Sequence, residues 1–327
     1  METLLFALAL ITLVIFVAVG IEIAVGNRSV RFLKDVLLPE ESSYPEVSVI
    51  IPARNEERKI EEALRSVLNQ DYEHLEVIVV NDRSTDRTGE ILDQIKQSHP
   101  RLRVLHTTEL PKGWLGKTHA LYYAAQRATG TYLLFTDGDV IMDPSTVSKA
   151  MCYVRQKGLD HLAVTPVVRM PGFLLGLFAG AFGIFFVLYA RPWKARDPRS
   201  SRYIGLGAFN LVRSEVYRLV GTHKAIAMRP DEDIKLGKLI KRGGYKQDLL
   251  FGKAMLTVEW YSSLKELIHG LMKNSFAGVG YNLLAMLASA TFLLLIFVWP
   301  FLGIFFTAGG AQLMNVIIAG MIVLLYW

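Results

Sequence analysis

The feature that most constrains this chain is a long, almost uncharged apolar stretch near each end. Residues 3–25 carry one charged side chain, Glu22, and residues 281–306 carry none. A helix needs about 20 residues to cross the hydrocarbon core of a bilayer. Both stretches reach that length, and after a short polar break the apolar character resumes to the end of the sequence. We therefore expect a transmembrane anchor at 1–26 and a transmembrane region of two helices at 281–327.

The first stretch has the features of an uncleaved anchor rather than a signal peptide. No positive charge precedes it, and it is longer than the roughly 7–15 apolar residues of a signal peptide. Arg28, Arg31 and Lys34 follow it, and such residues stay on the cytoplasmic side. The single cysteine, Cys152, excludes a disulfide framework within the chain. These features predict a multi-pass protein of the cell membrane whose main domain is cytoplasmic.

Between Glu46 and Val140, short apolar runs alternate with amphipathic ones. Strands alternating with helices favour an α/β fold, in which a mostly parallel sheet carries helices on both faces. In such sheets, ligands bind at the carboxyl ends of the strands. The predicted strands are 47–51, 75–80, 102–106 and 131–136, and the predicted helices are 57–70, a segment ending at Lys96, and 118–128.

Two carboxylates, Asp137 and Asp139, follow the fourth predicted strand and are separated by one glycine. Residues two apart on a strand point the same way. Two carboxylates aimed alike suit Mg²⁺ or Mn²⁺, which prefer oxygen ligands and commonly bridge phosphates. A solvated turn is the alternative, because Asp-Gly-Asp is also common turn chemistry.

A second polar cluster, NDRSTDRT, follows the second predicted strand. Asp82 stands directly at the strand end, where a carboxylate can accept hydrogen bonds from a nucleotide base or ribose. Ser84 and Asp86 instead have the character of helix caps, which is a structural role.

Two further segments each admit a functional and a structural interpretation. Lys117, at the start of a predicted helix, suits a diphosphate, although an ordinary surface lysine would look the same. Asp231, Glu232 and Asp233 open another predicted helix, where acidic residues normally complement the helix dipole. A general base among them would need to reach an acceptor hydroxyl.

The net charge of +6 would permit nucleic-acid binding, but the sequence contains no nucleic-acid motif. The basic residues cluster beside apolar segments, so anionic lipid and phosphate are the expected attractors. A transporter is disfavoured because few spans are available, and none carries internal ionisable pairs.

Six motifs in register resemble a family 2 glycosyltransferase of the GT-A fold over roughly residues 46–276. They are IIPARNEE, VVNDRSTDRT, GWLGKTHAL, FTDGD, GAFNLVR and PDEDIKLG. The apolar flanks and GLMKNSFAG (270–278) most resemble bacterial membrane enzymes that glycosylate hopanoid or carotenoid-type lipids. The resemblance implies a membrane-associated enzyme that uses a nucleotide-sugar, with UDP as the first expectation and GDP as the other.

The resemblance also implies roles for individual residues. The donor would be held by Pro52, Arg54, Glu56, Asp82, Lys117 and Asp137. Mg²⁺ or Mn²⁺ on its diphosphate would be held chiefly by Asp139, together with Asp137. Asp233 would be the base that deprotonates the acceptor hydroxyl, giving inversion at the sugar carbon. The donor and acceptor pocket would be lined by Gly207, Phe209 and Glu232.

The sequence departs from the family pattern in two places. Arg83 stands where the family often has glycine, and the sequence alone does not say whether its side chain points outward or reaches a phosphate. The sequence also contains no Arg-Trp pair, which processive synthases and ceramide glucosyltransferases carry in their Gln/Arg-x-x-Arg-Trp motif. This departure favours transfer of a single sugar.

The apolar segment 172–190 has the length of a membrane span, yet basic residues flank it on both sides. A single crossing would also separate Asp139 from Asp233. We therefore expect an interfacial or re-entrant element that gives a lipid acceptor an apolar route to the site. Residues 262–276 place apolar side chains on one helical face, either for the membrane surface or for the protein core.

The resulting hypothesis is a non-processive enzyme that moves one sugar to a membrane lipid hydroxyl. One alternative is transfer to a polyprenyl phosphate. The other is a non-catalytic membrane scaffold that retains a nucleotide-binding fold.

Overall fold

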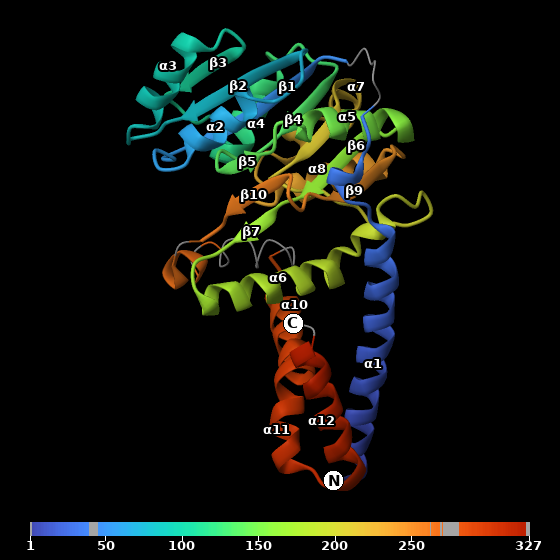
Figure 1. The fold of residues 1–327 in the computed structure, drawn as a ribbon. Helices are drawn as coiled ribbons and strands as arrows, with labels where there is room; N and C mark the ends of the chain where they lie inside the picture. Colours follow the sequence, from blue (N-terminus) through green and yellow to red (C-terminus); the bar gives the residue numbers. More distant parts are fainter. Residues whose placement is uncertain (1, 39–44, 262, 269, 271–280, 325–327) are drawn as a thin grey trace. The chain divides into compact units, whose positions relative to one another are not determined.

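The computed structural model describes residues 2–38, 45–261, 263–268, 270 and 281–324, which belong to two compact units (Figure 1). The α/β unit comprises residues 29–170 and 190–262. The helical unit comprises residues 1–28, 171–189 and 263–327.

A seven-stranded sheet forms the centre of the α/β unit, in the order β3-β2-β1-β4-β8-β6-β9. The four neighbours from β3 to β4 are parallel, as are β6 and β9, whereas β8 is antiparallel to both of its neighbours. The prediction of a mostly parallel α/β sheet is confirmed. Its strands are β1 (Val47–Ala53), β2 (Leu75–Asp82), β3 (Leu102–Thr107), β4 (Tyr132–Phe135), β6 (His161–Thr165), β8 (Asn210–Arg213) and β9 (Gln247–Phe251).

Helices cover both faces of this sheet because its strands are apolar on both sides. In β2, Val77 and Val79 belong to one buried cluster, and Ile78 and Val80 belong to the other. The first cluster includes residues of α2 (Ile60–Leu68), α3 (Thr88–Ser98) and α5 (Thr146–Lys157). The second includes residues of α4 (Gly116–Ala125), α7 (Ser214–Leu219) and α8 (Glu232–Arg242). Strands buried on both faces are typical of parallel sheets.

Smaller elements complete the α/β unit. A three-stranded sheet has the order β5-β10-β7. Its strands are β5 (Val140–Met142), β7 (Val167–Arg169) and β10 (Leu256–Glu259), and the short helical turns are η1 (Leu33–Asp35), η2 (Pro192–Lys194) and η3 (His223–Ile226).

Two histidines of this unit are buried beside polar side chains. The imidazole of His161 contacts Asn210, and that of His223 contacts the hydroxyl of Tyr217. Burial lowers the pKa of His161 to about 4 and that of His223 to about 3, so both rings are neutral near pH 7.

The helical unit contains the apolar segments. Two of its helices, Thr3–Ser29 and Leu283–Phe306, are long and apolar enough to cross a membrane, and a shorter apolar helix is Gly309–Leu324. Phe16, Ile296, Ile318 and Ile322 form a buried cluster between them. The elements are α1 (Glu2–Ser29), α6 (Phe173–Ala190), α10 (Leu283–Leu293), the π-helical turn η4 (Leu294–Val298), α11 (Trp299–Phe306) and α12 (Gly309–Leu324).

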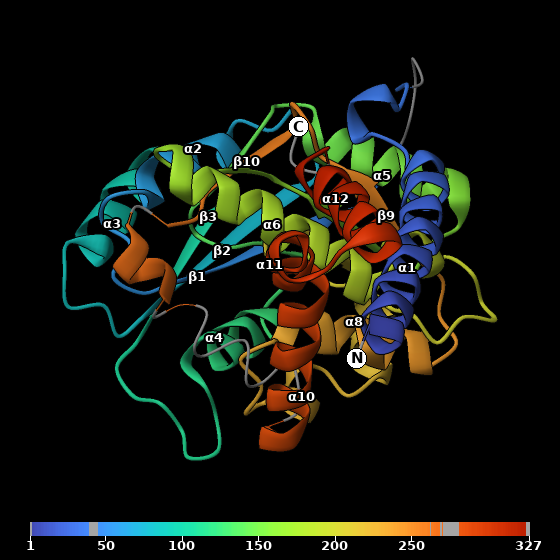
Figure 2. The same cartoon turned by 90° about the horizontal axis from the view of Figure 1, so that it is seen from below.

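Figures 1 and 2 show α1, α11 and α12 side by side within this unit, and α6 running crosswise to α1. α6 is one uninterrupted helix that coincides with the predicted element at 172–190. Of the predicted amphipathic helix at 262–276, residues 264–268 are helical. Residues 262, 269 and 271–276, and with them most of the GLMKNSFAG motif, lie outside the described residues.

Candidate functional site

The candidate site is built on the loops that leave the carboxyl ends of β1, β2 and β4. The β1 and β2 loops are joined to each other by hydrogen bonds. The Asn55 amide donates to Ser84 Oγ, and the Thr85 amide donates back to Asn55 Oδ1. Asp86 Oδ2 accepts from the Glu57 amide, so the two polar clusters form one surface. Ser84 therefore holds the neighbouring loop rather than capping a helix.

Asp82, at the end of β2, is held by a neighbouring arginine. Arg83 donates from Nε and from a terminal nitrogen to the two Asp82 carboxylate oxygens, each at 2.8 Å. Thr107, at the end of β3, donates to the same carboxylate at 3.2 Å. Burial raises the pKa of Asp82, but the hydrogen bonds and charge of Arg83, the hydrogen bond from Thr107 and the charge of Arg54 together outweigh burial, and the net pKa is lowered. Asp82 is therefore ionised, and its charge is already compensated.

The side chain of Arg83 points back toward Asp82. Its backbone is left-handed, with φ of +56°, a conformation that costs a residue with a side chain about 1–2 kcal/mol. Its guanidinium folds back onto Asp82 instead of pointing outward. Gly116 packs against this pair, since a Cβ there would contact Asp82 Oδ2 and lie 2.7 Å from an Arg83 nitrogen.

The other residues predicted at the β1 loop differ in their surroundings. Pro52 is half-buried within β1, and its register partner is Val80. Arg54 is exposed, and its positive charge contributes to lowering the pKa of Asp82. Glu56 lies instead beside the two carboxylates that follow β4, whose charges contribute to its pKa.

Three carboxylates lie close enough to affect one another at the end of β4, namely those of Glu56, Asp137 and Asp139. Burial, followed by the charge of Asp137, raises the pKa of Asp139 to about 6. Burial, followed by the charge of Asp139, raises the pKa of Glu56 to about 7. A divalent cation would offset this repulsion, and carboxylate oxygens are the ligands that Mg²⁺ and Mn²⁺ prefer. The side chains present therefore fit such an ion.

No group of three or more His, Cys, Asp or Glu side chains placed to hold a metal ion occurs among the residues that the structure describes. The protein would thus supply only part of the coordination shell. This fits Mg²⁺ in particular, which often keeps several waters and binds through one or two carboxylates plus substrate phosphates.

Lys117, in the first turn of α4, is shared by two carboxylates. Its Nζ lies 2.6 Å from Asp137 Oδ1 and 2.8 Å from Glu232 Oε1. Burial lowers the pKa of Lys117, but the charges of Asp137, Glu232 and Asp233 outweigh it and raise the pKa well above its usual value. The side chain as a whole is 40 % exposed, while its protonated amine is held between the two carboxylates.

Asp233, in the first turn of α8, is held by two backbone amides. Gly207 donates to Asp233 Oδ2 and Ile234 donates to Asp233 Oδ1, both at 2.7 Å. Burial, followed by the charge of Glu232, raises the pKa of Asp233 to about 7. A carboxylate with a pKa near the working pH suits a general base. Its neighbour Glu232 is buried and turned toward Lys117, so it does more than complement the helix dipole.

Gly207 links Asp137 and Asp233 through its backbone. Its carbonyl accepts from the Asp137 amide at 3.0 Å, while its own amide binds Asp233. A Cβ at this position would lie 2.6 Å from Asp137 Oδ2 and 3.3 Å from Lys117 Nζ. Only glycine fits here without displacing these groups.

The side chain of Phe209, which was predicted to line the pocket, lies in the protein core. Phe209 is fully buried and belongs to the main hydrophobic cluster. A large apolar side chain directly before β8 gains more from burial in the core than from a polar site. Phe209 therefore supports the Gly207 loop from beneath.

The sequence alone did not predict a role for Thr107 or Gly116. It also did not predict the orientation of Arg83. Thr107 ends β3 at the same sheet edge as Asp82, so its position in a parallel sheet was the available signal. The contact of Gly116 with Asp82 depends on how α4 packs, which local sequence patterns do not predict.

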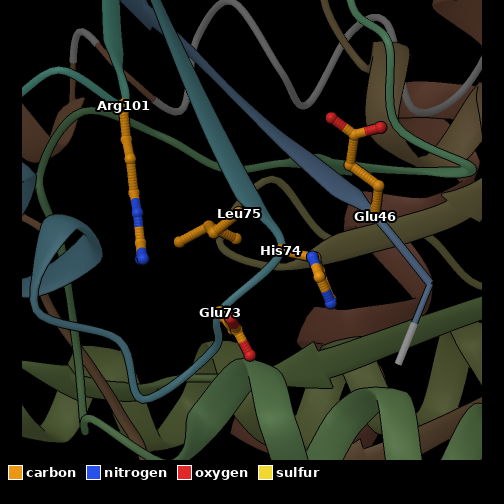
Figure 3. A pocket seen from close by; sticks show the side chains of 5 residues that line it. All are labelled: Glu46, Glu73, His74, Leu75 and Arg101. Carbon is orange, nitrogen blue, oxygen red and sulfur yellow. The ribbon is translucent and has the colours of Figure 1, made fainter. Parts of the chain in front are cut away.

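Another pocket of about 440 Å³ lies at the opposite edge of the sheet, before β1, β2 and β3 begin (Figure 3). It is lined by Glu46, Glu73, His74, Leu75 and Arg101. Figure 3 shows the charged ends of Glu46 and Arg101 on opposite sides of it. Its charged groups do not converge, and it contains none of the predicted site residues.

Sequence comparisons identify relatives of the chain. The model for Glycosyl transferase family 2 matches residues 48–211, half of the chain. The chain is 28 % identical over 239 residues to 4,4'-diaponeurosporenoate glycosyltransferase of Staphylococcus haemolyticus. That match covers 71 % of this chain and 61 % of the relative, so the chain spans less than two thirds of the relative's length. An uncharacterized glycosyltransferase of Haemophilus influenzae is 36 % identical over 118 residues, covering 36 % of this chain and 35 % of that protein.

A similar solved structure is that of a mannosyltransferase from Pyrobaculum calidifontis in complex with GDP-Man and Mn²⁺. The TM-score is 0.59 at 21 % sequence identity, over 98 % of this chain and 87 % of the other. At this identity the likeness concerns the fold alone, and it agrees with the GT-A architecture. The family match spans β1, β2, β4 and the Gly207 loop, and on that basis the chain belongs to glycosyltransferase family 2.

Proposed function

We propose that this protein transfers a single sugar from a nucleotide-sugar to a hydroxyl group of a membrane lipid, with inversion at the sugar carbon. The observation that carries the proposal is the cluster of Lys117, Asp137, Glu232 and Asp233 around the Gly207 loop. It brings a protonated amine and a base of raised pKa together from α4, β4 and α8. Family membership supports the reaction class.

The donor is proposed to lie along the carboxyl edge of the sheet. Asp82, with Arg54 and Pro52 on the same edge, would hold the nucleoside, for which UDP is the first expectation and GDP the other. Lys117 would bind the diphosphate, which gains negative charge as the sugar bond breaks, so its ammonium stabilises the transition state more than the ground state. Mg²⁺ or Mn²⁺ at Asp137 and Asp139 would supply further positive charge to the leaving diphosphate.

Asp233 is the proposed base. It would accept the proton of the acceptor hydroxyl while the hydroxyl oxygen attacks the sugar carbon from the face opposite the leaving group. The Gly207 and Ile234 amides hold its carboxylate in place, and each oxygen keeps a second lone pair for the proton.

The acceptor is proposed to be an apolar lipid that reaches the site from the membrane. The name of the Staphylococcus haemolyticus relative gives a carotenoid-type carboxylate, 4,4'-diaponeurosporenoate, for that protein, which supports an apolar lipid acceptor here but not the choice of a hydroxyl group. In this chain α1 and the helices 283–306 and 309–324 are proposed to be embedded in the cell membrane, with the domain at 46–276 in the cytoplasm. Because α6 has no internal turn, we propose an interfacial helix rather than a re-entrant hairpin.

Site-directed labelling tests the placement of α6. Pro171→Cys and Arg191→Cys are made singly in a Cys152→Ser background, with Lys112→Cys as an exposed control in the α/β unit. An impermeant maleimide is expected to label all three in inside-out vesicles and none in intact cells. Labelling of positions 171 and 191 from opposite sides would show that α6 crosses the bilayer.

Transfer itself is tested with membranes from cells that express the protein. Incubation with radiolabelled UDP- and GDP-sugars, followed by lipid extraction, is expected to place label in the lipid fraction only with Mg²⁺ or Mn²⁺ present. A product stable to mild acid excludes a polyprenyl phosphate acceptor, because sugar esters of polyprenyl phosphates are acid-labile. Absence of label with every donor would favour the non-catalytic scaffold.

A further inference from the structure

A second pocket of the α/β unit lies along β9, the edge strand that β8 and β6 separate from β4. Its volume is about 430 Å³, within the range of about 300–1,000 Å³ typical of small-molecule sites. We call it the basic pocket, because its lining includes one acidic residue, Asp248, and five basic ones. These are Arg31, Lys157, Arg196, Lys241 and Lys246.

Both carboxylate oxygens of Asp248, the acidic residue of the basic pocket, already have partners within the protein. Asp248 is buried, and its Oδ1 accepts from the Leu249 amide and lies 3.3 Å from Arg196 Nε. Its Oδ2 accepts from the Tyr153 hydroxyl at 2.8 Å. Lys241 donates to the carbonyls of Ala195 and Asp197, at 2.7 and 2.6 Å, on either side of Arg196. Asp248 and Lys241 therefore fix the segment that carries Arg196.

The other three basic side chains have no such partners. Arg31, Lys157 and Lys246 are exposed, and within the part of the chain that the structure describes none of them forms an ion pair. They come from three separate segments and face one pocket with Arg196. Like charges gathered in this way repel, and a bound anion would relieve the repulsion through charge-assisted hydrogen bonds.

The chain connects this pocket to two apolar helices. Arg31 stands two residues beyond the end of α1, and Arg196 six residues beyond the end of α6. A residue spans at most about 3.6 Å, so these tethers reach about 7 Å and about 22 Å. Basic clusters next to membrane helices attract anionic headgroups.

We propose that the basic pocket binds the phosphate group of an anionic phospholipid. The proposal rests on the membrane placement of α1 and α6 given above, but not on the transfer reaction. The site is separate from the proposed donor site, so a lipid bound here would be a ligand of the α/β unit and not the acceptor.

The test measures binding by the full chain in a neutral detergent. Calorimetric titration with a short-chain phosphatidylglycerol is compared with the matching phosphatidylcholine and with inorganic phosphate. The test variant is Lys157→Gln with Lys246→Gln, and the matched control is Lys96→Gln with Lys224→Gln, which removes the same charge from exposed lysines elsewhere. All four lysine side chains lie at the surface, so both variants are expected to unfold at the wild-type temperature.

Phosphatidylglycerol is expected to bind the wild type and the control equally. The test variant should bind about 30-fold more weakly, because each basic group near an anionic lipid contributes roughly a factor of five. Phosphatidylcholine should not bind. Binding of inorganic phosphate alone, lost in the same variant, would support the anion site but assign it a soluble ligand. No binding of either anion, or equal binding by both variants, would overturn the proposal. This binding test does not depend on sugar transfer. A protein without detectable transfer activity can therefore still confirm or contradict the proposed lipid site.

Discussion

Asp233→Asn is expected to lower the rate of sugar transfer by about 10²–10⁴-fold, the usual contribution of a general base. Asparagine keeps the shape of the carboxylate and one acceptor oxygen for the backbone amides of Gly207 and Ile234, but it cannot take the proton of the acceptor hydroxyl. Donor affinity should stay at the wild-type value, because Lys117, Asp137 and Asp139 remain in place. Transfer rates and donor binding, measured on the same preparation, separate the two effects.

The pH profile gives a second measurement of the same role. The pKa of Asp233 is raised to about 7, so the base is protonated, and inactive, below that pH. For the wild type, kcat/KM should therefore rise with pH through about 7, since this ratio reports the free enzyme. In Asp233→Asn the contribution of Asp233 to that limb should be absent, so that only the titration of Glu56 and Asp139 remains.

Asp231→Asn is the matched control for this substitution. Asp231 precedes α8 directly, but its oxygens bind Arg229 and Lys235 and neither the Gly207 amide nor Lys117. It should keep near-wild-type transfer. If Asp233→Asn also keeps its activity and its pH profile, Asp233 is not the base. That result would favour a phosphate acceptor, which needs little help from a base.

Asp139→Ala is expected to remove the response to divalent cations. In the wild type, Mg²⁺ or Mn²⁺ should strengthen donor binding and raise the unfolding temperature, since a ligand stabilises the folded state that binds it. In the variant both responses should be lost, and transfer should fall by on the order of 10²-fold or more, because a bound cation contributes several kcal/mol to transition-state stabilisation.

The same variant has an expected effect without metal. Burial and the charge of Asp137 both disfavour ionised Asp139. Removing this carboxylate therefore relieves repulsion, and in EDTA at pH 7 the variant should unfold at the wild-type temperature or above it. Asp93→Ala, an exposed aspartate of α3, serves as the control and should keep the metal response. A metal response that persists in Asp139→Ala would place the cation elsewhere.

Local sequence patterns predicted the first half of the α/β unit well. The four predicted strands correspond to β1, β2, β3 and β4, because each is a short apolar run bounded by polar loops. Consecutive parallel strands place their carboxyl ends at one sheet edge, so the shared edge of Asp82, Asp137 and Asp139 also followed from pattern alone.

The second half depends on contacts that are distant in the sequence. β8 lies between β4 and β6 as an antiparallel strand, and β4 pairs with it across about 75 residues of chain. No short-range periodicity specifies such a pairing. The orientation of Arg83 was likewise unpredictable, because it depends on a left-handed backbone and on the packing of α4 at Gly116.

The pairing of β4 with β8 has a consequence for biosynthesis. Until residues 210–213 have left the ribosome, β4 ends the nascent sheet with a row of unsatisfied backbone groups, and open edges of this kind recruit other chains. Translation products that stop between β4 and β8 should therefore aggregate or depend on chaperones, whereas those that extend past β8 should not. Synthesis of this protein on the ribosome thus includes a vulnerable interval of about 75 codons.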